Sequence, residues 1–247
     1  MIVERRFKVL LLVLATAVQG GTLAAQQARP AHILTVTKEG TTFLTLKAAD
    51  AKLSDIAADV ARQLNVKVLV APSLKDEKIT AEFAGTPLEP AMLALAPRVF
   101  IDYEVRRDAE PRPLGVHLLG LGDPDPAPNA VVQGTSQGLY VSGNTEDTGQ
   151  PAKDAPLRIT YAKGRLAVFA KEQPLIGVVM AIAEELGVPA EIKYESRQVI
   201  SVDIRETTAI EDVFVGLSEN VRVYVRSSAN RLDRTLLRVV VVPPEAK

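Results

Sequence analysis

The sequence predicts an α+β fold built from two copies of one small unit, on three observations. Residues 53–66 and 175–188 carry apolar side chains at the same helical spacing, i, i+3, i+4, i+7, i+8 and i+11, and 175 minus 53 gives an offset of 122 residues. Strand-like alternation flanks both segments in the same order. Residues 122–156, rich in Pro, Gly, Asp, Thr and Ser, separate the copies. Each copy is therefore expected to be a ββαββαββ unit with helices on a mixed sheet.

The first copy, residues 31–121, begins with a predicted hairpin, in which HILTVTK turns at Glu39-Gly40 into TTFLTLK. The helix LSDIAADVARQL follows, with Asn65 as its expected C-cap. The rest of the copy reads as two strands, a short apolar helix and two further strands, in the order VKVLVAP, KITAEFAG, LEPAMLAL, FIDYEVRR and GVHLLGL.

The second copy, residues 157–243, repeats this order. LRITYA turns at Lys163-Gly164 into RLAVFA, Pro174 lies in the first turn of the helix, and Gly187 is the expected C-cap. The later segments are PAEIKYE, VISVDIRE, IEDVFVGL, VRVYVRSS and TLLRVVVV. A connection as long as residues 122–156 is unusual inside one compact domain, so we expect two separately folded modules joined by a linker.

The N-terminus predicts a secretory signal peptide over residues 1–25. Arg5, Arg6 and Lys8 form a positive head, an apolar run follows at residues 9–18, and small residues offer cleavage after Ala24 or Ala25. The run is too short to span a bilayer. The alternatives are an uncleaved anchor or a buried helix. An exported chain without cysteine fits the bacterial periplasm, where it must be stabilised without disulfides.

Composition argues against several classes of function. The formal net charge is -1 and the pI is about 6.2, so nucleic acid is not an expected partner. The chain contains no cysteine, and neither His32 nor His117 has a second histidine at metal-ligand spacing, so neither a metal nor another cofactor is expected. Asp123 and Asp125 alternate as in calcium loops, but prolines interrupt the pattern, and we interpret them as a solvated acidic linker.

One string resembles a catalytic motif. Residues 134–138, GTSQG, fit the G-x-S-x-G nucleophile elbow around Ser136. No helix pattern follows the string and no histidine follows His117, whereas the hydrolase order needs a histidine after the serine. We therefore interpret the string as a turn and do not expect an enzyme. Glu184 and Glu185 are expected on the solvated face of the second long helix.

The strand VRVYVR suggests a binding face. Alternation should point the three valines at the helices and Arg222, Tyr224 and Arg226 away from them. Tyr and Arg are enriched at binding hot spots, so these three are the predicted partner-binding residues, although a solvated strand face is the plainer alternative. The matching positions of the first copy hold Asp102, Glu104 and Arg106, so the copies differ in charge there. The closing strands could also offer an edge for β-augmentation.

The order of these segments resembles the secretin and TonB short N-terminal domain. The second copy carries the resemblance through Glu172, Gln173, Pro174 and Leu175 and then through Leu186, Gly187 and Val188. The first copy matches at Leu53, Leu64, Leu88, Ala91 and Leu95, but it has Ala51-Lys52 in place of the Gln-Pro step and Asn65 in place of glycine. The resemblance implies a periplasmic interaction module, at the entrance of a secretin or on a receptor that signals to an inner-membrane regulator.

Together these observations predict a periplasmic, non-enzymatic protein–protein interaction module, accessory to a secretin, type IV pilus or TonB-linked envelope complex. Its expected partners are envelope proteins, such as a secretin or outer-membrane receptor complex, and it would meet the membrane only through them. The alternative is a periplasmic sensor that binds a small ligand or an envelope polymer between the two domains.

Overall fold

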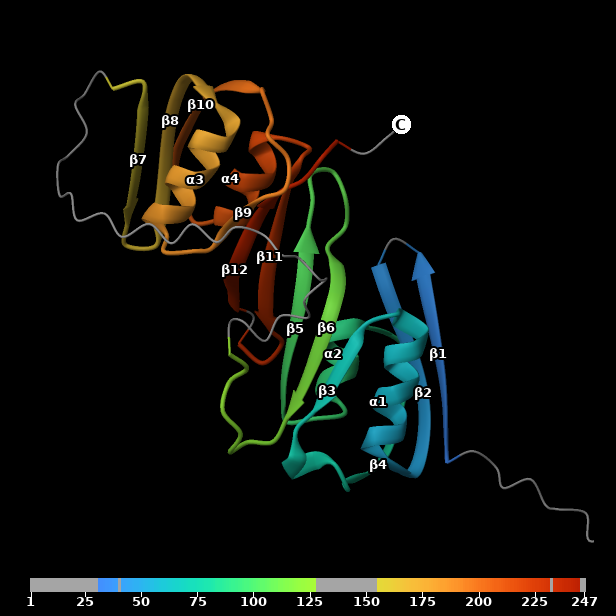
Figure 1. The fold of residues 1–247 in the computed structure, drawn as a ribbon. Coiled ribbons are helices and arrows are strands. Elements are labelled where there is room, and N and C mark those ends of the chain that lie inside the picture. The colour runs from blue at the N-terminus through green and yellow to red at the C-terminus, as the bar shows by residue number, and fades with distance from the viewer. Residues whose placement is uncertain (1–30, 40, 128–154, 232, 245–247) are drawn as a thin grey trace, which may run out of the picture. The chain divides into compact units, whose positions relative to one another are not determined.

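The computed structural model describes residues 31–39, 41–127, 155–231 and 233–244 (Figure 1). The predicted signal peptide and most of the predicted linker lie outside these ranges. Within them, no helix is long and apolar enough to cross a membrane. The described residues group into one compact unit.

We call the described residues up to 127 the first half of this unit and those from 155 onward the second half. The first half forms six strands, two α-helices and one 3-10 turn. In chain order they are β1 (His32–Glu39), β2 (Thr41–Lys52), α1 (Leu53–Leu64), β3 (Lys67–Val70), η1 (Pro72–Leu74), β4 (Lys78–Pro87), α2 (Leu88–Leu93), β5 (Arg98–Val105) and β6 (Arg112–Leu119). Asn65 ends α1 in the left-handed conformation, as its predicted capping role requires.

The described residues of the second half form six strands and two α-helices. They are β7 (Leu157–Ala162), β8 (Arg165–Pro174), α3 (Leu175–Glu185), β9 (Ala190–Ile192), β10 (Val199–Thr207), α4 (Ile210–Leu217), β11 (Val221–Ser228) and β12 (Asp233–Val241). Leu186 is the C-cap of α3, and Gly187 follows it with a φ of 64°, a conformation that glycine adopts without strain.

Neither long helix has a side-chain N-cap, and a backbone carbonyl takes that role in both. Leu53 N donates to Glu77 O at 2.9 Å, and Leu175 N donates to Gln198 O at 2.8 Å. The acceptor precedes β4 in one half and β10 in the other. The N-terminus of each long helix is thus hydrogen-bonded to the residue that directly precedes β4 in the first half and β10 in the second.

The strands form three sheets. Two have three strands each, in the orders β1-β2-β4 and β10-β8-β7, so β2 and β8 are central. The third has six strands in the order β3-β6-β5-β11-β12-β9. It is mixed, because β3 pairs parallel with β6 and β9 pairs parallel with β12, while the other neighbours are antiparallel.

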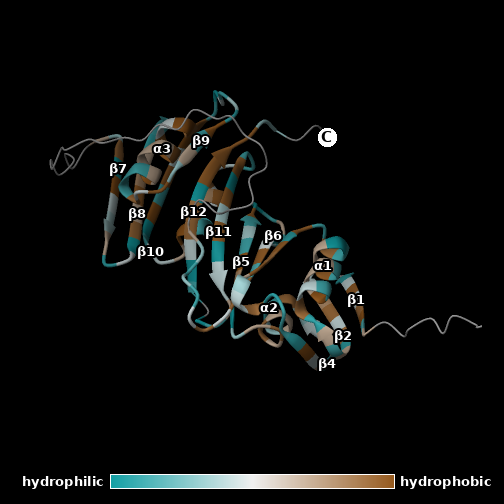
Figure 2. Cartoon of the chain, turned by 60° about the horizontal axis from the view of Figure 1, so that its bottom comes forward, coloured by the Kyte–Doolittle hydropathy of each residue, from teal (hydrophilic) through white to brown (hydrophobic). Residues whose placement is uncertain are grey.

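In each half, two helices pack between a three-stranded sheet and part of the six-stranded sheet (Figures 1 and 2). Helix α1 contacts β1, β2 and β3, and α2 contacts β2, β4 and β5. Helix α3 contacts β7, β8 and β9, and α4 contacts β10 and β11. The apolar faces predicted for the long helices are buried, since Leu53, Ile56 and Val60 in α1 and Leu175, Val178 and Ile182 in α3 are inaccessible to solvent.

The predicted α+β class with a mixed sheet is confirmed. The arrangement of the halves differs from the expectation of two separately folded modules, because β5 of the first half pairs antiparallel with β11 of the second. Buried side chains of both strands, including Ile101, Val105, Val223 and Val225, belong to one hydrophobic cluster. The predicted boundaries at residues 121 and 157 themselves stay predictions.

Candidate functional site

The three predicted partner-binding residues lie where the two halves meet. Arg222, Tyr224 and Arg226 are on β11, and the register with β5 places Tyr224 opposite Glu104 and Arg226 opposite Asp102. Arg222 and Arg226 are only 7% and 5% exposed. The expectation that these two arginines lie on an open face is therefore wrong, because the first half of the same chain covers them. We call the β5–β11 pairing the seam.

Asp102 is the most deeply buried charge of the seam, with no exposed surface. Arg226 approaches it with two nitrogens, Nε at 2.6 Å from Oδ1 and Nη2 at 3.0 Å from Oδ2. His117 Nε2 lies 3.2 Å from the same Oδ2. Arg226 also donates through Nη1 to the carbonyls of Pro126, at 2.6 Å, and Ala127, at 3.0 Å. This bidentate geometry compensates for the cost of burying both charges.

These contacts keep Asp102 ionised. Burial alone raises the pKa of its carboxyl, but hydrogen bonds from His117 and Arg226, together with the positive charge of Arg226, hold that pKa below its ordinary value. A His–Asp pair can orient a catalytic imidazole. Here both side chains are buried and Arg226 occupies both carboxylate oxygens, so we interpret the cluster as a structural lock between the halves.

Glu104 is a second acidic centre of the seam. Its carboxylate is paired with Arg106, lies 3.9 Å from Arg222 Nε, and lies 3.5 Å from the hydroxyl of Tyr224. The guanidinium of Arg238 stacks 4.2 Å from the centre of the Tyr224 ring. Burial and the negative charge of Glu104 raise the pKa of Tyr224 above its ordinary value, so its hydroxyl stays protonated at neutral pH.

The first residues of the predicted linker are attached to the folded chain. Asp123 accepts hydrogen bonds from Ser73 Oγ and from Gly120 N, both at 2.6 Å. Asp125 pairs with Arg98 of the first half and lies 3.5 Å from Arg231 of the second. The interpretation of these two aspartates as a merely solvated linker is therefore wrong. Among the described residues, no group of three or more His, Asp or Glu side chains could hold a metal ion.

The other sequence candidates lie apart from the seam. His32 on β1 forms a 2.8 Å contact with Asp59 of α1. Glu184 and Glu185 are exposed at the end of α3, as predicted. Ser136 and its G-x-S-x-G string lie outside the described residues.

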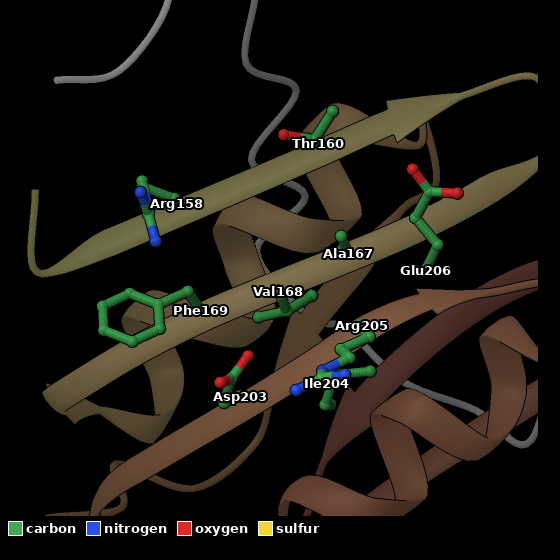
Figure 3. Close-up of a pocket in the computed structure, with 9 residues that line it drawn as sticks. All are labelled: Arg158, Thr160, Ala167, Val168, Phe169, Asp203, Ile204, Arg205 and Glu206. Atoms are coloured by element: carbon green, nitrogen blue, oxygen red, sulfur yellow. The ribbon is translucent and has the colours of Figure 1, made fainter. Parts of the chain in front are cut away.

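A hollow of about 480 Å³ lies on the outer face of the β10-β8-β7 sheet (Figure 3). The register aligns Arg158, Phe169 and Asp203 in one row across the three strands. The guanidinium of Arg158 stacks 4.8 Å from the centre of the Phe169 ring. Thr160, Ala167 and Arg205 also line the hollow. The lining of the hollow thus combines aromatic, cationic and anionic side chains.

The first half has a different row at the same place. Ile33, Lys47 and Glu82 align across β1, β2 and β4, and Lys47 Nζ lies 3.3 Å from Glu82 Oε1. In the first half, an ion pair thus stands where the second half has the stacked Arg158 and Phe169.

Sequence reasoning found one side of the seam and missed the other. It assigned Arg222, Tyr224 and Arg226 to an external partner and treated Asp102 and Glu104 as a mere difference between the copies. The signal was present in the opposite charges of two corresponding strands, which favour pairing of those strands with each other. Comparison with family models, curated proteins and solved structures finds no match for this chain.

Proposed function

We propose that the chain is a periplasmic, non-enzymatic protein–protein interaction module made of two copies of a ββαββαββ unit of the secretin and TonB short N-terminal type. The common element order, the central position of β2 and β8, and the matching carbonyl caps of α1 and α3 support the duplication. The apolar spacing of the two long helices supports it independently.

The observation that carries a docking role is the seam itself. Two strands of similar units join edge to edge, and acidic side chains on β5 face basic side chains on β11. Pairing of exposed strand edges is also a general way in which proteins recognise extended segments of other chains. The seam is thus an internal example of the recognition that we propose toward envelope proteins.

Export and partner capture test this function together. The full chain with a C-terminal tag is produced in its native bacterium, the envelope is crosslinked, and the tagged protein is purified. We expect a periplasmic protein shortened at its N-terminus by the signal peptide, together with a reproducible envelope partner. An intact N-terminus in the cytosolic fraction, or the absence of any partner, would contradict the proposal.

The outer hollow favours a second candidate, a sensor that binds a small ligand or an envelope polymer. Phe169 with its stacked Arg158, and Asp203 across the row, offer an apolar surface beside charged groups, as many ligand sites do. The described hollow lies on one outer sheet and not between the halves, where the sequence placed such a ligand. Thermal stabilisation by cell-wall fragments, without any stable protein partner, would favour this candidate.

A further inference from the structure

Strands β1 and β7 occupy the same place in their sheets, each at one end beside the central strand. Ala49 N donates to Ala31 O at 3.0 Å, and Lys171 N donates to Pro156 O at 2.8 Å. In an antiparallel pair, residues that bond the neighbour alternate with residues whose backbone groups point away. The outward backbone groups are therefore those of Leu157, Ile159 and Tyr161 in β7 and, in β1, those of His32, Leu34, Val36 and Lys38.

Side chains of helix α1 cover the outward edge of β1. Gln63 Nε2 donates to the outward carbonyl of Leu34 at 2.9 Å. The contact between Asp59 and His32 fixes the helix to the start of the same strand. The carbonyl of Leu34 is therefore already hydrogen-bonded, so it is not free to accept a bond from a further strand.

Within the described residues, helix α3 offers no such cover to β7, and no strand pairs with its outer side. With the offset of 122, Ala181 and Glu185 stand where α1 has Asp59 and Gln63. The sequence of α3, LIGVVMAIAEE, contains no side chain that donates a hydrogen bond when its glutamates are ionised. Ile159 corresponds to Leu34 in the sheet, because Ile159 pairs with Val168 as Leu34 pairs with Leu46. An ionised Glu185 cannot donate a hydrogen bond to the carbonyl of Ile159, as Gln63 donates to that of Leu34.

The side chains along β7 define what could pair with it. On the helix side, Leu157 and Ile159 are half-buried and Tyr161 is 39% exposed, so the apolar row is incompletely covered. The outer side of β7, the hairpin turn and the outer side of β8 carry four basic residues: Arg158, Lys163, Arg165 and Lys171. Two acidic side chains that line the hollow, Asp203 and Glu206, lie on β10, beyond β8, and Glu206 Oε2 lies 3.3 Å from Arg165 Nη1. Arg158, Lys163 and Lys171 therefore carry the basic character beside the edge of β7.

We propose that the outer edge of β7 docks an extended segment of a partner protein in which acidic residues alternate with apolar ones. The segment hydrogen-bonds to the outward groups of Ile159 and Tyr161, places its apolar side chains beside them, and places its acidic side chains beside Arg158. This inference rests on the proposed docking function and assigns it to one edge. A second copy of β7 fits less well, because self-pairing would bring both copies of Arg158 onto one face.

The first experiment measures peptide binding. The probe is a labelled synthetic peptide in which valine alternates with glutamate, and a lysine–valine peptide is its control. Tyr161→Pro removes an outward N–H from the exposed end of β7 and leaves the β7–β8 ladder intact. Lys38→Pro removes an outward N–H from β1 and is the matched control, and circular dichroism and thermal melting establish that both variants fold.

We expect the glutamate peptide to bind the unaltered chain and Lys38→Pro alike, and to bind Tyr161→Pro about tenfold or more weakly. Stronger salt should weaken this binding. Equal binding to Tyr161→Pro, or equal binding of the lysine peptide, would overturn the assignment.

A crosslink locates the bound segment without relying on proline. The chain contains no cysteine, so a single introduced cysteine reacts alone. Thr160 would face a non-hydrogen-bonded position of an added strand, where side chains approach closely enough for a disulfide. Thr160→Cys should trap a glutamate peptide carrying one cysteine, whereas Thr35→Cys, at the corresponding place on β1, should trap little.

Equal trapping at both positions would overturn the inference. Disulfide dimers of Thr160→Cys that form faster than the peptide adduct would assign the edge to a second copy instead. Crosslinking in the envelope distinguishes failure of the β7 assignment from failure of the docking function. If a partner is captured equally by the unaltered chain and by Tyr161→Pro, the docking function stands and the β7 assignment fails, whereas absence of any partner contradicts the function itself.

Discussion

Strands β1 and β7 have the same place in the fold but different surroundings. The edge of β1 is hydrogen-bonded by Gln63 and fixed near its start by the contact between His32 and Asp59. The edge of β7 faces a helix whose only polar side chains are glutamates. An uncovered strand edge is an aggregation hazard unless charges or a partner protect it. Because the first half covers the edge of β1, the fold itself does not require an open edge at the corresponding strand β7.

The seam is a third way to close a strand edge. Strands β5 and β11 would each be edge strands in an isolated half, and here each covers the other. Opposite charges favour this pairing, because Asp102 on β5 faces Arg226 on β11 and Glu104 lies 3.9 Å from Arg222. Within the described residues, a side-chain cap thus covers the edge of β1, strand pairing covers those of β5 and β11, and the edge of β7 stays open beside basic side chains.

The largest expected effect comes from breaking the seam. Arg226→Ala leaves Asp102 buried without its cation, and loss of one member of a buried pair costs about 3–5 kcal/mol. Urea unfolding followed by circular dichroism measures this loss. Arg165→Ala is the control, because Arg165 and Glu206 form an exposed pair 3.3 Å apart, and we expect it to cost less than about 1 kcal/mol. Similar losses for both variants would show that the seam does not stabilise the unit.

The elements of this fold were largely predictable, because helices and strands follow local periodicity. The predicted helix over residues 53–64 matches α1 (Leu53–Leu64), and the hairpin turn at Lys163-Gly164 joins β7 to β8. The sharing of a sheet was not predicted, because pairing between residues far apart in sequence leaves no periodic signal. Only the opposite charges of two corresponding strands marked it.

The candidate site was predictable in its residue types but not in its place. Arg and Tyr are enriched in interfaces, and Arg222, Tyr224 and Arg226 do lie in one, although within the chain. The hollow around Phe169 could not be predicted, because it depends on which side chains align across three strands. The helix-side cap of β1 also escaped prediction, since Gln63 and Leu34 belong to different elements and only the fold brings them together.

The second prediction concerns acid stability of the seam. The pKa of Asp102 is lower in the folded chain than in the unfolded chain, so its ionisation stabilises the fold above the unfolded pKa of about 4. This contribution is lost as the pH falls through the lowered folded pKa. We expect the difference in unfolding free energy between the unaltered chain and Asp102→Asn to shrink steadily below about pH 4. A difference that stays constant from neutral to acid pH would contradict the ionised state of Asp102.

The third prediction exchanges the helix residues that distinguish the two edges. Gln63→Glu should remove the donor to Leu34 O and cost about 1 kcal/mol. Glu185→Gln places an amide at the corresponding position of α3, where it can donate to Ile159 O, and should add a few tenths of a kcal/mol up to about 1 kcal/mol. Chemical denaturation measures both changes, and the glutamate peptide should bind Glu185→Gln more weakly than the unaltered chain. Tighter peptide binding to Glu185→Gln would contradict the role of the cap.

The smallest expected effect concerns the outer faces. Arg158→Ala removes the cation stacked on Phe169, and exposed cation–π contacts contribute about 0.5–1 kcal/mol. Lys47→Ala removes an exposed ion pair with Glu82, which contributes no more than about 1 kcal/mol. Both variants should therefore fold with nearly unchanged stability in thermal melts. Because Arg158 flanks the open edge and Lys47 lies beside a capped one, only Arg158→Ala should weaken binding of the glutamate peptide. Equal weakening by both variants would mean that the peptide responds to net charge and not to the edge of β7.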